Sequence, residues 1–320
     1  MIKPGKGVLL SGNVTKVTVK ELPGFYKTIL DLIPNNPFQS LSNGDMMPII
    51  VFALLMGFAI IKLGDKAKGL ADVMSALSMV MFSIINIIIA LIPYGVFGLM
   101  AVAMARYGTA IFGPVLKFIL ADYLSQGTMV AVVYSVFLIG IAKVNPLAFW
   151  RKAIQPYIIA FSTCTSSAAL PVSMDIAPKK LGVPRDISSF VLPLGATANM
   201  NGTCIYFGII VIFASQLYGI DLSLQQQVLL VLQATFLSVG CAATPQIGLI
   251  ISITLLTQMG LPLEATALVA GIYRIIDQAH TATNSSGDLV TSVCIAAMEG
   301  ELDREALNDP NHGNNVSTVA

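Results

Sequence analysis

Long runs without a single charged residue limit what this chain can fold into. Residues 73–105, 187–220 and 222–263 carry no Asp, Glu, Lys or Arg. A helix needs about 20 apolar residues to cross the hydrocarbon core of a membrane, and each of these runs is longer than that. Charged residues make up only 11% of the chain and apolar residues 55%, whereas a soluble domain carries roughly 25% charged residues. The sequence therefore predicts an all-α membrane protein.

Simple membrane spans are predicted at five places. They are residues 46–62, 74–104, 111–141, 188–218 and 265–298. Basic residues follow the first and third of these spans, which predicts that both ends lie on the cytoplasmic side. The net charge of +1 leaves no basic face, so a nucleic-acid partner is not expected. Membrane lipid is the expected surroundings of this multi-pass protein.

The two ends of the chain have a different composition. Residues 1–45 include a polar stretch interrupted by prolines, which we interpret as an extramembrane loop. Residues 301–320 are charged and then rich in Asn and Gly, which is typical of a soluble, poorly ordered tail. The four cysteines have no metal-ligand spacing, so we interpret them as free thiols.

Two further apolar segments are interrupted by polar residues. STCTSSAALP (162–171) interrupts the first and SVGCAATPQIG (238–248) the second. Each half is too short to cross a membrane alone, and lipid cannot satisfy a broken backbone. We therefore predict two re-entrant helical hairpins, a pattern that points to a transporter's binding site. Two complete spans with Ser/Gly kinks are the alternative.

Polar residues also gather inside the fourth predicted span. Asn199, Asn201 and Thr203 lie there beside Gly195 and Gly202, which weaken the helix. An unwound helix frees backbone carbonyl groups that can bind a small cation. Interhelical hydrogen bonds made by the asparagines are the alternative role.

The last predicted span, residues 265–298, carries most of the ionisable groups. Residues at intervals of three or four share one helical face; they are Arg274, Asp277, His280, Thr281, Asn284 and Asp288. A charge at the membrane centre costs about 2.5–3.5 kcal/mol, so such groups are functional candidates by default. We expect Asp277 to bind an ammonium group, Asn284 a carboxylate and Asp288 a cation. A structural Arg274–Asp277 pair beside a merely buried His280 is the alternative.

Together these motifs resemble the dicarboxylate/amino acid:cation symporter family, which includes glutamate transporters. LPLGATANMNGT (192–203) is similar to the family's LPLGAT-N-M-D-G-T, and DQAHTATNSSGD (277–288) to its D-x-x-R-T-x-x-N-x-x-G-D. The two interruptions resemble the family's hairpin tips. The resemblance covers nearly the whole chain. Members of the family have eight spans, and this chain would lack the first three of them.

The resemblance implies a homotrimer in the cell inner membrane, in which a transport domain moves against a trimerisation scaffold. Residues 46–142 would form scaffold and linking spans, and residues 143–300 the transport core with both hairpins. We expect a carrier and not an enzyme, with no catalytic residue and no cofactor, and with Na⁺ as the coupling ion.

The resemblance also implies the site residues. The solute would contact Ser166, Ser167, Thr203, Asp277, His280, Thr281 and Asn284. One sodium site would combine Asp288 with backbone oxygens of Gly195, Asn199 and Asn284, and a second would use those of Thr197, Ser238, Val239 and Cys241. Asn201 replaces an Asp of the family, and a neutral ligand weakens the case for a third sodium ion.

Two residues indicate the solute. Asp277 favours a solute with an ammonium group over a plain dicarboxylate. His280 stands where the family places an Arg that pairs with an acidic side chain, and a His is not a permanent bidentate partner. We therefore expect a neutral or polar amino acid. The alternatives are an acidic amino acid or dicarboxylate symporter, a channel, or an inactive truncated remnant that acts as a hetero-oligomer partner.

Overall fold

The computed structural model of the chain describes residues 33–43, 46–241 and 246–309, and in these ranges it contains helices and turns but no strand. Residues 1–32, the hairpin-tip residues 242–245 and the end of the tail at 310–320 lie outside the description. Much of the predicted N-terminal loop is therefore not covered. The all-α prediction is confirmed for the described residues.

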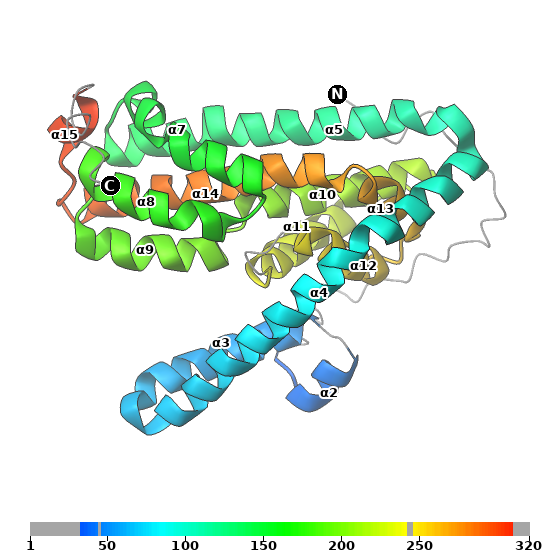
Figure 1. The fold of residues 1–320 in the computed structure, drawn as a ribbon, viewed down its shortest axis with the longest axis horizontal. Helices are drawn as coiled ribbons and strands as arrows, with labels where there is room; N and C mark the ends of the chain where they lie inside the picture. Colours follow the sequence, from blue (N-terminus) through cyan, green and yellow to red (C-terminus); the bar gives the residue numbers. More distant parts are fainter. Residues whose placement is uncertain (1–32, 44–45, 242–245, 310–320) are drawn as a thin grey trace.

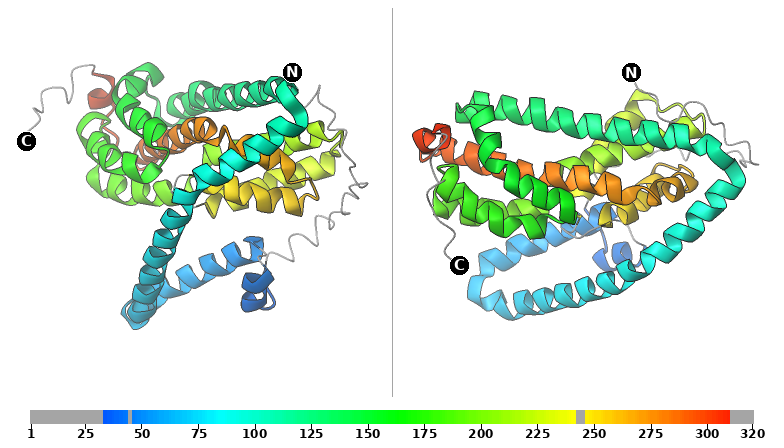
Figure 2. Two further views of the ribbon diagram at one scale, coloured as in Figure 1. Left: turned by 45° about the vertical axis from the view of Figure 1, so that its right-hand side comes forward. Right: turned by 45° about the horizontal axis from the view of Figure 1, so that its top comes forward.

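The first helices form an arm that projects from the rest of the chain and contacts it along part of its length (Figures 1 and 2). It consists of α2 (Pro37–Asn43), α3 (Met46–Leu63) and the long helix α4 (Lys68–Tyr107). Large apolar side chains on α3 and α4 point outward, among them Phe58 and Ile61. So many exposed apolar side chains are unfavourable in water, so the arm needs lipid or protein around it.

Helix α2 corrects part of the prediction that residues 1–45 form a loop. Pro37 begins the helix, where its missing N–H is not needed. The Asn36 side chain accepts from the N–H groups of Phe38 at 3.0 Å and Gln39 at 3.2 Å. This capping pattern starts a helix, and the sequence interpretation overlooked it.

A second long helical segment crosses the top of the molecule in Figure 1. It contains α5 (Phe112–Thr128), the π-helical turns η3 (Met129–Val133) and η4 (Leu138–Ala142), and α6 (Tyr134–Phe137) between them. Among the described residues, three helical segments are long and apolar enough to cross a membrane: Pro48–Met81, Gly108–Ala142 and Arg185–Leu217. Their composition agrees with the predicted membrane location.

The rest of the described chain forms eight longer helices, taken here in four pairs that are consecutive in the sequence. The first pair is α7 (Pro146–Thr163) with α8 (Ser166–Lys180), and the second is α9 (Arg185–Ala198) with α10 (Asn201–Leu217). The third is α11 (Leu224–Val239) with α12 (Ile247–Gln258), and the last is α13 (Glu264–Ala270) with α14 (Tyr273–Met298).

Two of these pairs are the predicted hairpins. Helices α7 and α8 pack against each other, as do α11 and α12, and the four have 18, 15, 16 and 12 residues. Cys164 adopts a left-handed conformation (φ 57°) that ends α7 and turns the chain back. This reversal rules out a kinked continuous span for the first hairpin. In the second hairpin the antiparallel halves lie on either side of residues 242–245.

Helix α14 lies in the middle of these pairs (Figure 1) and packs against α7, α8, α9, α10 and α5. The predicted spans 188–218 and 265–298 are each broken, at Asn199–Met200 and at Gly271–Ile272. Nineteen of the 26 residues of α14 are buried, among them Asp277, His280, Asn284 and Asp288, whereas Arg274 and Thr291 are exposed. The packing therefore removes the most polar helix of the chain from lipid.

The C-terminal tail is partly ordered, which corrects the prediction for residues 301–309. Helix α15 (Arg304–Asn308) docks on the bundle, and Leu307 is fully buried. The Arg304 Nε donates to the Ala142 carbonyl oxygen at 2.8 Å. The apolar residues Leu302, Ala306 and Leu307 within the charged stretch supply a buried face, which composition alone concealed.

Candidate functional site

The break between α9 and α10 brings the backbone of α10 against α14. A Cβ added to Gly202 would lie 2.7 Å from the Cα of His280 and 2.9 Å from its carbonyl carbon. The Asn284 Oδ1 accepts from the Gly202 N–H at 2.7 Å and the Thr203 N–H at 3.4 Å. Asn284 thus binds the unpaired N–H groups at the start of α10.

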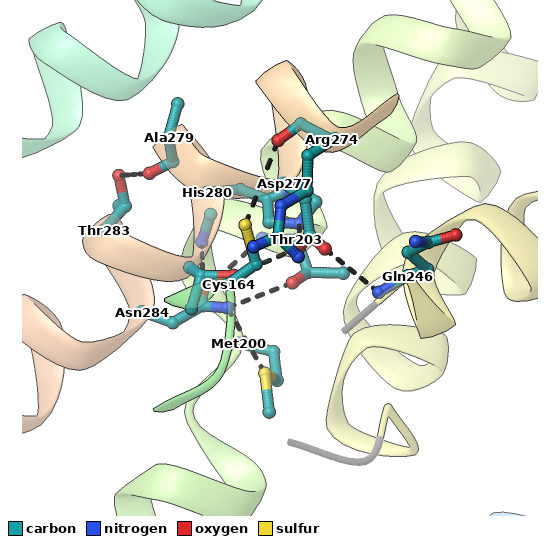
Figure 3. Close-up of polar contacts among 12 residues, drawn as sticks. Cys164, Met200, Thr203, Gln246, Arg274, Asp277, Ala279, His280, Thr283 and Asn284 are labelled. Carbon is teal, nitrogen blue, oxygen red and sulfur yellow. Dashed lines mark hydrogen bonds and ion pairs between the residues drawn. The ribbon is translucent and has the colours of Figure 1, made fainter. Parts of the chain in front are cut away.

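Asp277 is the centre of the polar contacts, and it is only 3% exposed (Figure 3). Its Oδ1 lies 2.6 Å from the His280 Nε2 and accepts from the Thr281 hydroxyl at 3.1 Å. Its Oδ2 accepts from the Gln246 backbone N–H, at the start of α12, at 2.9 Å. The second hairpin therefore contacts the carboxylate that we expected to bind an ammonium group.

Arg274 does not pair with Asp277 among the described residues. Its Nη2 donates to the Ser162 carbonyl oxygen at the end of α7, at 3.3 Å. The backbone of Arg274 accepts a weak hydrogen bond from the Cys164 thiol at 3.9 Å. The structural Arg274–Asp277 pair is therefore not formed, and Arg274 instead contacts the first hairpin near its tip.

Both hairpin tips line one small cavity with the broken helix and α14. Its lining residues are Cys164, Thr165, Ser166, Met200, Thr203, Cys241, Ile247, Gly248, Asp277, His280, Thr281 and Asn284. The cavity volume is about 20 Å³, which is room for roughly one water molecule. An amino acid is larger, so the tips must separate before one can enter.

Six of the seven predicted solute contacts line this cavity, and one does not. Ser166 begins α8 and is buried, whereas Ser167 is exposed and lies outside the lining. The Asn284 Nδ2 donates to the Thr203 Oγ1 at 3.0 Å and contacts the Met200 sulfur at 3.3 Å. Most of the polar atoms named here thus already satisfy one another, whereas the buried His280 Nδ1 has no hydrogen-bond partner among the described residues.

A second polar cluster surrounds Asp288, one turn further along α14. The Asn199 Nδ2 donates to the Asp288 Oδ1 at 2.8 Å. Gly195 lies against the same carboxylate, since a Cβ there would lie 2.8 Å from its Cγ. Asn201 donates to the Tyr134 hydroxyl at 3.2 Å, which itself donates to the Thr283 carbonyl at 2.9 Å.

This donor set fits a hard cation such as Na⁺. It offers one carboxylate together with amide and carbonyl oxygens, which hard cations prefer. No group of three or more His, Cys, Asp or Glu side chains comes together in the described residues, as a thiolate- or imidazole-rich transition-metal site would need. Asp288, Gly195 and Asn199, three of the four residues predicted for the first sodium site, therefore lie together, and their binding of a cation stays a prediction.

The residues predicted for a second cation site lie where α9 contacts α11. Thr197 is exposed, and its hydroxyl donates to the Leu194 carbonyl at 2.9 Å. The Ser238 carbonyl accepts from the Cys241 N–H at 3.0 Å, and Val239 is partly exposed. Whether these four carbonyl oxygens bind one ion stays a prediction.

The sequence interpretation missed two buried polar residues on α5 and two tyrosines, on α10 and α14, that lie beside the site. Asp122 is fully buried in α5, and the Gln126 Nε2 lies 3.5 Å from its Oδ1 and 2.9 Å from the Gly202 carbonyl oxygen. Tyr206 and Tyr273 place their rings 5.5 and 5.8 Å from that of His280. An Asp and a Gln four residues apart inside an apolar span were a sufficient signal.

Comparison with known proteins agrees with the motifs. The sequence profile described as "Sodium:dicarboxylate symporter family" matches residues 1–298. The chain is 34% identical to the proton/sodium-glutamate symport protein of Bacillus caldotenax, with 87% of this chain and 66% of that protein aligned. It is 33% identical to the proton/glutamate-aspartate symporter of Escherichia coli, over 95% of this chain and 72% of that protein.

A C4-dicarboxylate transport protein of Rhodospirillum rubrum is 32% identical, over 90% of this chain and 64% of that protein. The chain thus spans about two thirds of the length of these curated relatives. The first two relatives are symporters by name and the third is a transport protein, so none is an enzyme. The chain belongs to the sodium:dicarboxylate symporter family.

Proposed function

We propose that this protein is a cation-coupled symporter for an amino acid, located in the cell inner membrane as a homotrimer. The observation that carries the proposal is the buried Asp277 carboxylate between the two hairpin tips. A carboxylate buried among the helices of a membrane protein favours a solute with a positive group. The names of the relatives, glutamate and glutamate-aspartate symporters among them, support the same class of solute.

In the proposed bound state, the solute's ammonium group lies beside Asp277 and Thr281. Its carboxylate lies at the start of α8, near Ser166 and Ser167, and beside the Asn284 amide. The N-terminus of a helix carries a partial positive charge that suits an anion. The Gln246 N–H, which contacts Asp277 at 2.9 Å without solute, must move away, so opening of the second hairpin admits the solute.

The clusters beside this cavity support the proposed sodium coupling. A cation bound by Asp288 and the carbonyl oxygens of the broken helix lies one turn of α14 away from Asn284. A second cation bound by backbone oxygens of Thr197 and residues 238–241 would hold the second hairpin in its closed position. Each ion that favours the closed hairpin also raises solute affinity, because binding free energies at linked sites are reciprocal.

Within this class we propose a neutral or polar amino acid as the preferred solute. The only basic side chain lining the described cavity is His280, and its Nε2 already lies 2.6 Å from Asp277. A second solute carboxylate would lie near Asp277 without an Arg to balance it. An acidic amino acid is the second candidate, because the relatives' names include glutamate and aspartate.

An uptake screen tests the proposal. Cells that express the protein are given each of the twenty amino acids and succinate, in sodium medium and in choline medium. We expect sodium-dependent accumulation of one or a few neutral or polar amino acids. Accumulation of succinate with no amino acid would refute the role of Asp277, and uptake that never exceeds the external concentration would indicate a channel.

Asp288→Asn is expected to raise the sodium concentration for half-maximal uptake by about tenfold. The amide oxygen keeps the acceptor for Asn199, so the change removes only the charge that attracts the ion, and tenfold equals about 1.4 kcal/mol. Sodium titrations of uptake measure the shift. Asp221→Asn, at an exposed position between α10 and α11, is the control, and an equal sodium dependence in all three proteins would exclude Asp288 as a ligand.

His280→Arg is expected to shift the preference toward aspartate and glutamate. The guanidinium adds a permanent, bidentate partner for a second carboxylate. Competition of unlabelled aspartate against the best neutral solute measures the shift, expected as at least a tenfold gain in relative affinity. If competition is the same in both proteins, His280 does not determine specificity.

A further inference from the structure

A cavity of about 350 Å³ lies at the opposite end of the first hairpin from its tip. It opens where α7 begins, α8 ends and α15 docks, at the left of Figure 1. Its lining residues include Asn145, Leu147, Arg151, Lys152, Lys180 and Asn308. None of them belongs to the solute or cation sites described above.

Three of the lining residues are basic, and one is fixed in place. Lys152 is 9% exposed, and its Nζ donates to the Lys180 carbonyl at 3.1 Å and the Ala306 carbonyl at 2.7 Å. Asp309 lies close enough to Lys152 to attract it. The guanidinium of Arg151 is exposed and makes no hydrogen bond or ion pair with the described residues. The cavity thus has an excess of positive charge.

The start of α7 adds to this positive potential. Asn145 caps the helix by accepting from the Leu147 N–H at 2.9 Å, and α7 is 18 residues long. The N-terminus of such a helix carries about half a positive charge. Basic side chains and a helix N-terminus around one cavity favour an anion with several oxygen atoms, of which phosphate is the common biological example.

An apolar stripe leads away from the same cavity along α7. Leu147, Ile154 and Ile158 are 59%, 48% and 56% exposed. With Arg151 they occupy positions at intervals of four, three and four, which place them on one face of the helix. A soluble phosphate gains no favourable contact with such an apolar stripe, whereas the acyl chain of a lipid can pack against it.

We propose that this cavity binds the phosphate headgroup of an anionic phospholipid, whose acyl chains lie along the stripe of α7. The basic residues that follow the span 111–141 predict that this end faces the cytoplasm, where anionic lipids attract basic residues near the membrane surface. A lipid bound here would contact the first hairpin and, through Lys180 and Lys152, the docked α15.

Lipid binding to the purified protein tests the proposal. The protein in neutral detergent is titrated with phosphatidylglycerol, with phosphatidylcholine of the same chains, and with inorganic phosphate, and bound ligand is counted by native mass spectrometry. The site variant is Arg151→Gln with Lys180→Gln. The control is Lys179→Gln with Arg185→Gln, which removes two charges from neighbouring exposed positions outside the cavity.

We expect phosphatidylglycerol to bind at least tenfold more tightly than phosphatidylcholine. Each basic residue contributes about fivefold to such binding, so the site variant, which lacks two of them, should lose about 25-fold and the control less than twofold. Equal binding of both lipids, or equal losses in the two variants, would overturn the proposal. Binding of inorganic phosphate that depends on Arg151 and Lys180, with no preference for the anionic lipid, would identify a soluble anion as the ligand instead. A melting temperature within a few degrees of the unmodified protein verifies that both variants fold.

Discussion

Asp277→Asn is expected to abolish amino-acid uptake while the protein still reaches the membrane. The amide keeps the size of the side chain but removes the negative charge that we assign to the solute's ammonium group. Loss of one member of a buried, hydrogen-bonded charge pair costs about 2–5 kcal/mol, which corresponds to a fall in affinity of at least about 30-fold. Radiolabelled uptake and surface abundance measured in the same cells check this expectation.

Asp175→Asn is the matched control for that substitution. Asp175 lies on α8, exposed to its surroundings and paired with Lys179. The same chemical change there should leave uptake within twofold of the unmodified protein. Full uptake by Asp277→Asn would reject the ammonium assignment, whereas loss in both variants would point to a general effect on the membrane protein's folding.

Gly202→Ala is expected to destabilise the protein and to abolish solute binding with it. The added methyl would lie 2.7 Å from the Cα of His280, and a helix backbone cannot rotate away as a side chain can. Overpacking of this kind costs about 1–3 kcal/mol or more. Separation of α10 from α14 would also break the 2.7 Å hydrogen bond from the Gly202 N–H to Asn284. The melting temperature should fall by roughly 5 °C or more.

Gly208→Ala, six residues further along the same helix, is the control for this effect. A Cβ at Gly208 would meet nothing within 4 Å, and Ala favours a helix over Gly by about 1 kcal/mol. Thermal unfolding in detergent should therefore show an unchanged or slightly raised melting temperature for Gly208→Ala. Equal melting temperatures for both variants would contradict the close approach of α10 to α14.

The sequence was most informative where its polar residues violated the rules of a membrane span. The interruptions at 162–171 and 238–248 predicted the paired short helices, because lipid cannot accept a broken backbone. The spacing of Asp277, His280, Thr281 and Asn284 predicted one polar face of α14, which follows from helical geometry alone. These expectations required no knowledge of which helices are neighbours.

Contacts between segments that are distant in the sequence could not be predicted from local patterns. The polar pair Asp122 and Gln126 was detectable inside an apolar span, but its partner, the Gly202 carbonyl, was not. The order in residues 301–309 was missed because three apolar residues in a charged stretch are a weak signal. The contact of Gln246 with Asp277 joins residues 31 positions apart, which no local pattern encodes.

By itself, the sequence determined that this protein is a helical membrane protein with two hairpins, a broken helix and a polar final helix. Local composition decides these features, since the membrane excludes charges and unpaired backbone groups wherever they face lipid. Only the tertiary structure decided that both hairpin tips meet α14 around Asp277, and that His280 lies against this carboxylate. The same local patterns are compatible with many arrangements of the helices. Which of these arrangements forms depends on how helices that are distant in the sequence pack against one another.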